Sequence, residues 1–168
     1  MRNRALDLGR LAILLAVSAA AAFAATPCLA AAADEAEADR LYDEGLALYQ
    51  RQDYRAAGER WEQALAPFRK LGLETEAANT LNNLGVVARN LAQYDKALGY
   101  YQEALATRRK LGLEKDAAET LNNMGNVAHD LAQRDKASGY YQEALATYRK
   151  LGLEREAANI LKIGRAHV

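Results

Sequence analysis

The chain of 168 residues contains little cysteine, proline or histidine, and it has no excess of either charge. A single cysteine, Cys28, excludes an intramolecular disulfide and a cysteine-rich zinc site. Two prolines in a chain of this length favour helices, which proline interrupts. Basic and acidic residues each number 22, so the net charge gives no indication of nucleic-acid binding. Apolar residues make up 51% of the chain, which is typical of a folded protein.

The sequence also shows no recognisable arrangement of metal-binding, nucleophilic or phosphate-binding residues. His129 has no second histidine or cysteine in the repeated part of the chain with which to bind a metal ion. No serine or cysteine has a base beside it, and no glycine-rich loop suits a phosphate group. The sequence therefore predicts a protein without enzymatic activity, cofactor or metal.

The dominant feature is an internal repeat with a period of 40 residues. Residues 81–120 and 121–160 are identical at 29 of 40 positions without a gap. Residues 41–80 match 81–120 at 16 of 40 positions in the same register. A fixed period of this length indicates stacked units that bury their apolar faces against their neighbours. An array of this kind predicts a surface for binding.

Each unit has the pattern of a helical hairpin. Apolar residues recur at three- and four-residue spacing over 77–88 and again over 97–105, with an interruption at residues 92–95. Gly112 follows three cations and suits a left-handed helix cap. Small residues allow the two helices to approach closely, and a tyrosine fills the space between them: Gly85, Ala97, Ala104 and Tyr101.

These positions resemble the tetratricopeptide repeat family in its 40-residue form, as in kinesin light chain, over about residues 36–162. The matching residues in three successive units are Leu41, Gly45, Leu48, Ala57, Trp61 and Ala64; Leu81, Leu84, Gly85, Ala88, Ala97, Tyr101 and Ala104; and Leu121, Met124, Gly125, Ala128, Ala137, Tyr141 and Ala144.

The resemblance implies an all-α fold, a right-handed superhelical array of antiparallel helical hairpins (an α-solenoid). Three repeats are expected at about 38–77, 78–117 and 118–157, with a partial fourth at 158–162. The first unit departs from the family pattern at Pro67, which cannot donate to the carbonyl of Gln63. We therefore expect its helix to kink or stop there.

One stripe on the first helix of each unit lies outside the apolar pattern. It comprises Tyr42, Asp43, Leu46, Tyr49 and Gln50; Asn82, Asn83, Val86, Arg89 and Asn90; and Asn122, Asn123, Asn126, His129 and Asp130. Asparagine is a mediocre helix former whose amide both donates and accepts hydrogen bonds. A ladder of such amides can hold the backbone of an extended peptide, and the resemblance implies that Asn83 and Asn123 do so while Arg89 selects the ligand. In the alternative interpretation, these amides bond to adjacent helices and hold the repeats in register.

Two further patterns recur with the repeat. Cations lie at the ends of the second helices: Arg69 and Lys70; Arg108, Arg109 and Lys110; Arg149 and Lys150. We interpret them as complements of the helix dipole, with an acidic partner as the alternative. Among paired tyrosines, Tyr101 and Tyr141 are expected in the core, and Tyr100 and Tyr140 half-exposed on the outer face.

The N-terminus has the order of a secretory signal peptide over residues 1–33. Three arginines, a long uncharged stretch and small residues follow one another: Arg2, Arg4 and Arg10, then residues 11–33. Cleavage is expected after Ala30 or Ala33. An uncleaved membrane anchor is the alternative, because 23 uncharged residues can span a bilayer. Pro27 and the alanine-rich composition favour cleavage and a bacterial origin, which places the mature protein in the periplasm or outside the cell, without membrane contact.

Residues 163–168 depart from the repeat, which predicts glycine where Arg165 stands. We interpret this hexapeptide as a sequencing-adapter scar, and we expect the natural protein to continue past Lys162.

The sequence thus predicts an exported scaffold that binds a protein or an extended peptide in a concave groove. The alternative is a sensor arm at the N-terminus of a larger protein that carries a caspase-like peptidase domain, called CHAT. A third interpretation is self-association through the exposed last hairpin.

Overall fold

The computed structural model describes residues 30–166, and the side chains of residues 30–162. It divides into two units, Met1–Glu37 and Ala38–Val168. The expected signal peptide lies outside the described residues except for 30–33, and residues 30–37 are helical. Of the described helices, none is both long enough and apolar enough to cross a membrane.

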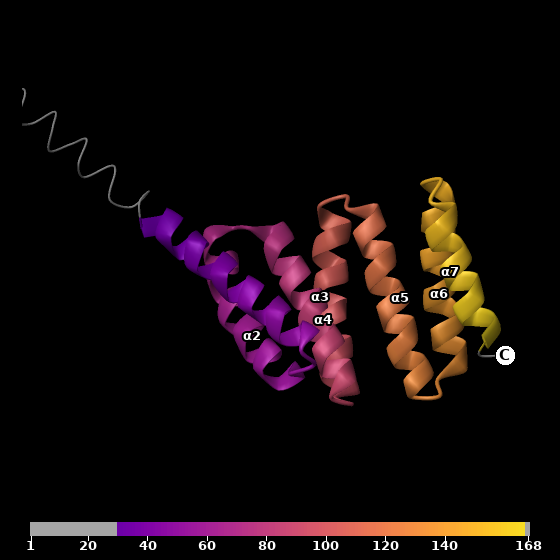
Figure 1. The fold of residues 1–168 in the computed structure, drawn as a ribbon. Helices are drawn as coiled ribbons and strands as arrows, with labels where there is room; N and C mark the ends of the chain where they lie inside the picture. Colours follow the sequence, from indigo (N-terminus) through magenta and orange to yellow (C-terminus); the bar gives the residue numbers. More distant parts are fainter. Residues whose placement is uncertain (1–29, 167–168) are drawn as a thin grey trace, which may run out of the picture. The chain divides into compact units, whose positions relative to one another are not determined.

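The described part of the second unit is built from helices joined by short turns (Figure 1). Residues 38–50 are followed by α2 (Tyr54–Leu71), α3 (Glu74–Asn90), α4 (Tyr94–Lys110), α5 (Glu114–Asp130), α6 (Arg134–Lys150) and α7 (Glu154–Ala166). From α2 onward each helix packs against the next one along the chain, and α3 also contacts α5. The expected all-α array of antiparallel hairpins is confirmed, and α7 extends through residues 163–166 of the hexapeptide.

The close approach within each hairpin follows from a glycine facing an aromatic ring. A Cβ atom added to Gly85 would lie 2.5 Å from the Tyr101 ring, and one added to Gly125 would lie 2.5 Å from the Tyr141 ring. In the first hairpin, Gly45 faces Trp61 in the same way, also at 2.5 Å. Tyr101 is 1% exposed, so the small residue and the ring together form the centre of the hairpin core, as predicted.

The turns use two kinds of left-handed residue. Between hairpins this residue is Gly112 (φ 71°) or its equivalents Gly72 and Gly152, which confirms the predicted cap. Within the second hairpin it is Ala92, with φ 55°, and Ala132 repeats this conformation in the third. A side chain in the left-handed region costs roughly 1–2 kcal/mol, so the turn holds local strain. The turn is also shorter than predicted, because α4 already begins at Tyr94.

The expected helix stop at Pro67 is wrong, because α2 continues through Pro67 to Leu71. Only one backbone hydrogen bond is lost at this position. Packing on both sides of the proline outweighs that loss: Ala64 and Phe68 are 0% and 2% exposed.

Candidate protein-binding face

The first helices of the hairpins (residues 38–50, α3 and α5) carry the stripe that the sequence singled out. α3 and α5 contact each other directly, whereas α2, α4 and α6 contact one another less. Ion pairs join the second helices to one another, where Arg69 of α2 reaches Glu103 of α4 and Arg109 of α4 reaches Glu143 of α6. We call the stripe side of the first helices the inner face.

Hydrogen bonds join neighbouring repeats along the inner face in one register. The Nδ2 of Asn83 donates to the hydroxyl oxygen of Tyr42 at 2.9 Å. One repeat later, the Nδ2 of Asn123 donates to the Oδ1 of Asn82 at 3.3 Å. In both pairs the partners are 41 residues apart, which is one more than the 40-residue repeat. Each residue therefore contacts the residue that follows its equivalent in the next repeat. These amides therefore hold repeats in register.

The same register brings two predicted site residues together as an ion pair. The Nε of Arg89 lies 2.6 Å from the Oδ2 of Asp130, again 41 residues away. The hydrogen bond from Arg89 holds the pKa of the Asp130 carboxyl below its usual range, and Asp130 raises the pKa of Arg89. His129 is also near, with its Nδ1 3.7 Å from Oδ1 of Asp130. Arg89 is thus partly neutralised by its own chain.

Burial divides the predicted site residues into three groups. Asn82 is 5% exposed and lies under the surface, where its Oδ1 serves the packing of the repeats. The partly buried group comprises Tyr42, Tyr49, Asn83, Val86, Arg89, Asn122, Asn123, Asn126 and His129. The exposed group comprises Asp43, Leu46, Gln50, Asn90 and Asp130. The stripe is therefore a shallow surface, and Asn82 is its one fully covered member among these residues.

Two amides of the third repeat differ in their partners. The hydroxyl of Tyr141 donates to Oδ1 of Asn126 at 2.8 Å, which ties the inner face to the ring that fills the hairpin. The buried Oδ1 of Asn122 has no hydrogen-bond partner among the described side chains. It is the equivalent of the Asn82 oxygen, whose partner lies 41 residues further on.

A buried arginine went unrecognised in the sequence, where it was grouped with the cations at helix ends. Arg108 is 4% exposed and joins three elements. Its guanidinium donates to the carbonyl oxygen of Asp116 (2.9 Å), to the hydroxyl of Thr120 (2.6 Å) and to Oδ1 of Asn79 (2.9 Å). Burial lowers the pKa of Arg108. The repeat register carried a signal for this burial, because the equivalent positions hold Phe68 and Tyr148.

Comparisons with known proteins agree with this geometry. The family model for the tetratricopeptide repeat matches residues 36–110 and 76–150. The chain belongs to the tetratricopeptide repeat family. The search of curated protein sequences found no match.

Solved structures with the same fold include BtubC (BKLC) from P. vanneervenii, with 22% identity, a TM-score of 0.61, and coverage of 77% of this chain and 62% of that one. Aspartyl phosphate phosphatase F from Bacillus subtilis has 16% identity and a TM-score of 0.67, covering 79% and 40%. The tetratricopeptide domain of Arabidopsis FLU has 19% identity and a TM-score of 0.66, covering 70% and 98%. The chain thus spans less than two thirds of the length of the first two proteins.

The recurring cations of this tetratricopeptide array are largely paired with acids of the same chain. The Nζ of Lys110 lies 2.7 Å from Glu74 within the second hairpin, and the Nζ of Lys150 lies 2.8 Å from Glu114 within the third. Arg69 and Arg109 pair with glutamates of the next second helix. These exposed pairs leave little excess positive charge for an acidic partner.

Within residues 30–162, no group of three or more histidine, cysteine, aspartate or glutamate side chains converges where it could hold a metal ion. The polar groups that the inner face brings together are amides, hydroxyls and one ion pair. This chemistry suits the binding of a polypeptide, whose backbone offers donors and acceptors in equal number. Proteins of this family generally mediate protein–protein interaction.

Proposed function

We propose that the chain is a scaffold that binds an extended segment of a partner protein on its inner face. The observation that carries this proposal is the amide pair Asn83 and Asn123. Both side chains are partly exposed at equivalent places of adjacent repeats, and each is held by one hydrogen bond to a neighbouring repeat. The packing and binding interpretations of these amides are therefore compatible.

A primary amide has two N–H donors and a carbonyl oxygen with two lone pairs. The inter-repeat bond of Asn83 uses one N–H, and so does that of Asn123. Each amide keeps one N–H and its oxygen for a ligand. Because the inter-repeat bond already fixes the side-chain rotamer, little conformational entropy is lost when a peptide backbone binds.

Charge contributes less to this proposal than the sequence suggested. Arg89 and Asp130 are bonded to each other, so a ligand that paired with Arg89 would compete with an existing partner. Apolar contacts are available on the same stripe, because Leu46 is 42% exposed and Val86 is partly buried. We propose that the partner is chosen mainly by shape and apolar side chains, with the amides holding its backbone.

The test begins with peptides selected from a random display library against the chain. Binding of a selected peptide is then compared in the wild type and in the Asn83→Ala plus Asn123→Ala variant. Two lost hydrogen bonds predict a loss of affinity of roughly tenfold or more. The matched control is Gln102→Ala plus Gln142→Ala, which removes two exposed amides from second helices. Unchanged affinity in the Asn variant, together with lowered stability, would reduce the amides to a packing role.

We also propose that the protein acts after export, on the basis of the signal-like order of residues 1–33. N-terminal sequencing of the protein from a producing bacterium tests this directly. Chains that begin at Ala31 or Asp34 would support export, and chains that begin at Met1 would contradict it.

A further inference from the structure

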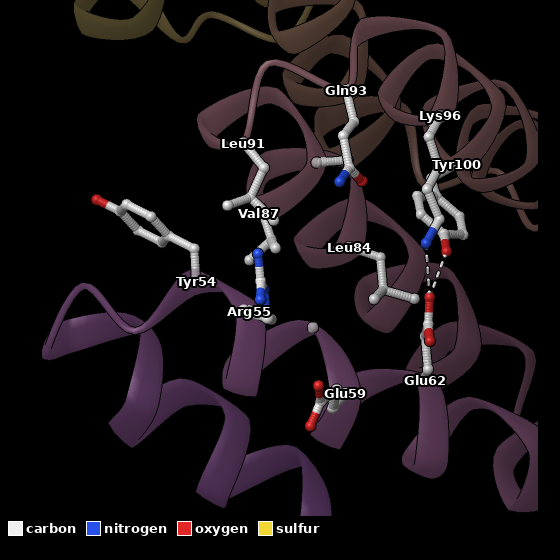
Figure 2. Close-up of a pocket in the computed structure, with 12 residues that line it drawn as sticks. Tyr54, Arg55, Glu59, Glu62, Leu84, Val87, Leu91, Gln93, Lys96 and Tyr100 are labelled. Atoms are coloured by element: carbon white, nitrogen blue, oxygen red, sulfur yellow. Dashed lines mark hydrogen bonds and ion pairs between the residues drawn. The ribbon is translucent and has the colours of Figure 1, made fainter.

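A pocket of about 250 Å³ lies on the side of α3 opposite the inner face. Leu84, Val87 and Leu91 of α3 form its apolar floor, and Tyr54, Arg55 and Glu59 of α2 line it from the other side (Figure 2). Gly58 of α2 is also part of the lining. Helical spacing separates this floor from the stripe residues of the same helix. The pocket is smaller than the roughly 300–1,000 Å³ of sites for drug-sized ligands, so a single side chain is the scale of group that fits.

Gly58 brings no side chain to the pocket. A Cβ atom added there would lie 3.3 Å from Cγ1 of Val87, a tight contact that Val87 would relieve by shifting a few tenths of an ångström. In the next repeat the equivalent residue is Leu98. Leu98 is partly buried and packs against the hydrophobic cluster that contains Val127, the equivalent of Val87.

Of the three floor residues, only Leu91 is left open at the first junction, between the first and second hairpins, because Leu84 and Val87 are 2% and 4% exposed. Leu91 is 37% exposed, a large value for a leucine that lines a pocket. Its equivalent, Leu131, is partly buried in the cluster that Leu98 helps to cover. The array itself therefore shows which group fits over this floor, namely a leucine side chain.

The rim of the pocket is fixed by hydrogen bonds. Figure 2 shows Lys96 and Tyr100 of α4 pointing toward Glu62 of α2, at 2.9 and 2.8 Å from its Oε1. In the next repeat the place of Glu62 is taken by Gln102, so this tie is particular to the first junction. It joins α2 to α4 at the rim of the pocket.

We propose that the Gly58 pocket is a second binding site, which takes a leucine-sized aliphatic side chain presented by a partner protein. The partner's side chain completes the junction in the way that Leu98 completes the next one. This site is independent of the proposed inner-face function, because it shares none of the amide residues.

The probe for this site is N-acetyl-leucinamide, titrated into the full chain with methyl groups of leucine and valine isotopically labelled. Saturable shifts of the Leu84, Val87 and Leu91 methyl signals are expected. N-acetyl-alaninamide has the same amide groups without the isobutyl group. It should bind about tenfold to a hundredfold more weakly, because it loses the free energy gained by burying a leucine side chain.

Gly58→Leu places the residue of the next repeat in the pocket and should abolish the leucinamide shifts. Gly99→Leu is the matched control, because an added Cβ at Gly99 meets no atom within 4 Å, and it should bind as the wild type does. Leu98→Gly provides an independent test by opening an equivalent pocket, and should add leucinamide shifts at Val127 and Leu131.

The proposal is overturned if the methyl signals of the three floor residues do not shift with N-acetyl-leucinamide, or if N-acetyl-alaninamide shifts them equally. It is also overturned if Gly58→Leu leaves the leucinamide shifts unchanged. Should Gly58→Leu fail to fold, absence of new shifts in Leu98→Gly overturns it as well. The Asn83→Ala plus Asn123→Ala variant separates this site from the inner face, because it should keep the leucinamide response whether or not it still binds a selected peptide.

Discussion

Replacing Gly85 by alanine tests the packing on which the hairpin depends. The added Cβ would lie 2.5 Å from Cε1 of Tyr101 and 2.7 Å from both Cδ1 and Cζ. Carbon atoms in good contact are about 3.5–4.0 Å apart, so the ring must retreat by roughly 1 Å. Tyr101 is 1% exposed and has no room to do so without displacing its neighbours. Overpacking of this kind costs about 1–3 kcal/mol.

Alanine also gains about 0.5–1 kcal/mol over glycine inside a helix, and this gain must be separated from the strain. Gly99→Ala supplies the reference, because Gly99 lies within α4 and its added Cβ meets nothing within 4 Å. The helix-propensity gain is common to both variants, so their difference in free energy of unfolding isolates the strain, about 1–3 kcal/mol.

Urea denaturation of the two variants measures this difference from the shift in midpoint at constant slope. Gly99→Ala should be more stable than the wild type and Gly85→Ala less stable. Tyr101→Leu should lower the free energy of unfolding less in the Gly85→Ala background than in the wild type, because the smaller side chain makes room for the added methyl group. Equal stabilisation by Gly85→Ala and Gly99→Ala would refute the packing account.

Three other variants follow from the structure. Ala92→Gly should raise the free energy of unfolding by up to about 1 kcal/mol, since it removes left-handed strain, and urea midpoints that fall instead would contradict the turn. Arg108→Tyr, which introduces the residue found in the third repeat, should keep the free energy of unfolding within about 1 kcal/mol of that of the wild type. Arg108→Ala leaves an unfilled cavity, and thermal melts should show that its free energy of unfolding is lower by about 2–4 kcal/mol. The lowered pKa of the Asp130 carboxyl means that its pairing stabilises the fold above its ordinary pKa and is lost as pH falls through the lowered value. Asp130→Asn should therefore lose less stability than the wild type in urea titrations between pH about 5 and pH about 2, and equal losses would show that the Arg89 pair is unimportant.

The features within one repeat could be read from the sequence because the 40-residue period aligns equivalent residues. Gly85 and Tyr101 recur as Gly125 and Tyr141, and their pairing is confirmed by the structure. The left-handed Gly112 is confirmed for the same reason, since glycine is the residue that best suits that conformation.

Contacts between repeats could not be read in the same way. On the inner face they follow a spacing of 41 residues, which depends on how one hairpin is displaced against the next. That displacement is a property of the assembled stack, so Asn82 was expected to be open and is buried. Arg108 was missed because a cation near a helix end has a ready explanation in the dipole, and only its aromatic equivalents indicate burial.

Several inferences from the sequence stay predictions. Four predictions do not follow from the fold: the signal peptide, the adapter origin of residues 163–168, self-association through the last hairpin, and the peptidase-linked alternative. Reading the gene beyond Lys162 tests two of them together. A downstream domain with a catalytic histidine and cysteine would favour the sensor-arm alternative, and continued repeats alone would count against it.

The most direct test of the central claim is to map a selected peptide on the chain by backbone and side-chain NMR. Our account predicts that the shifted signals cluster on the inner face, at Asn83, Val86, Asn123 and Asn126. Shifts confined to second-helix residues such as Gln102 and Glu143, with the inner face unperturbed, would contradict it.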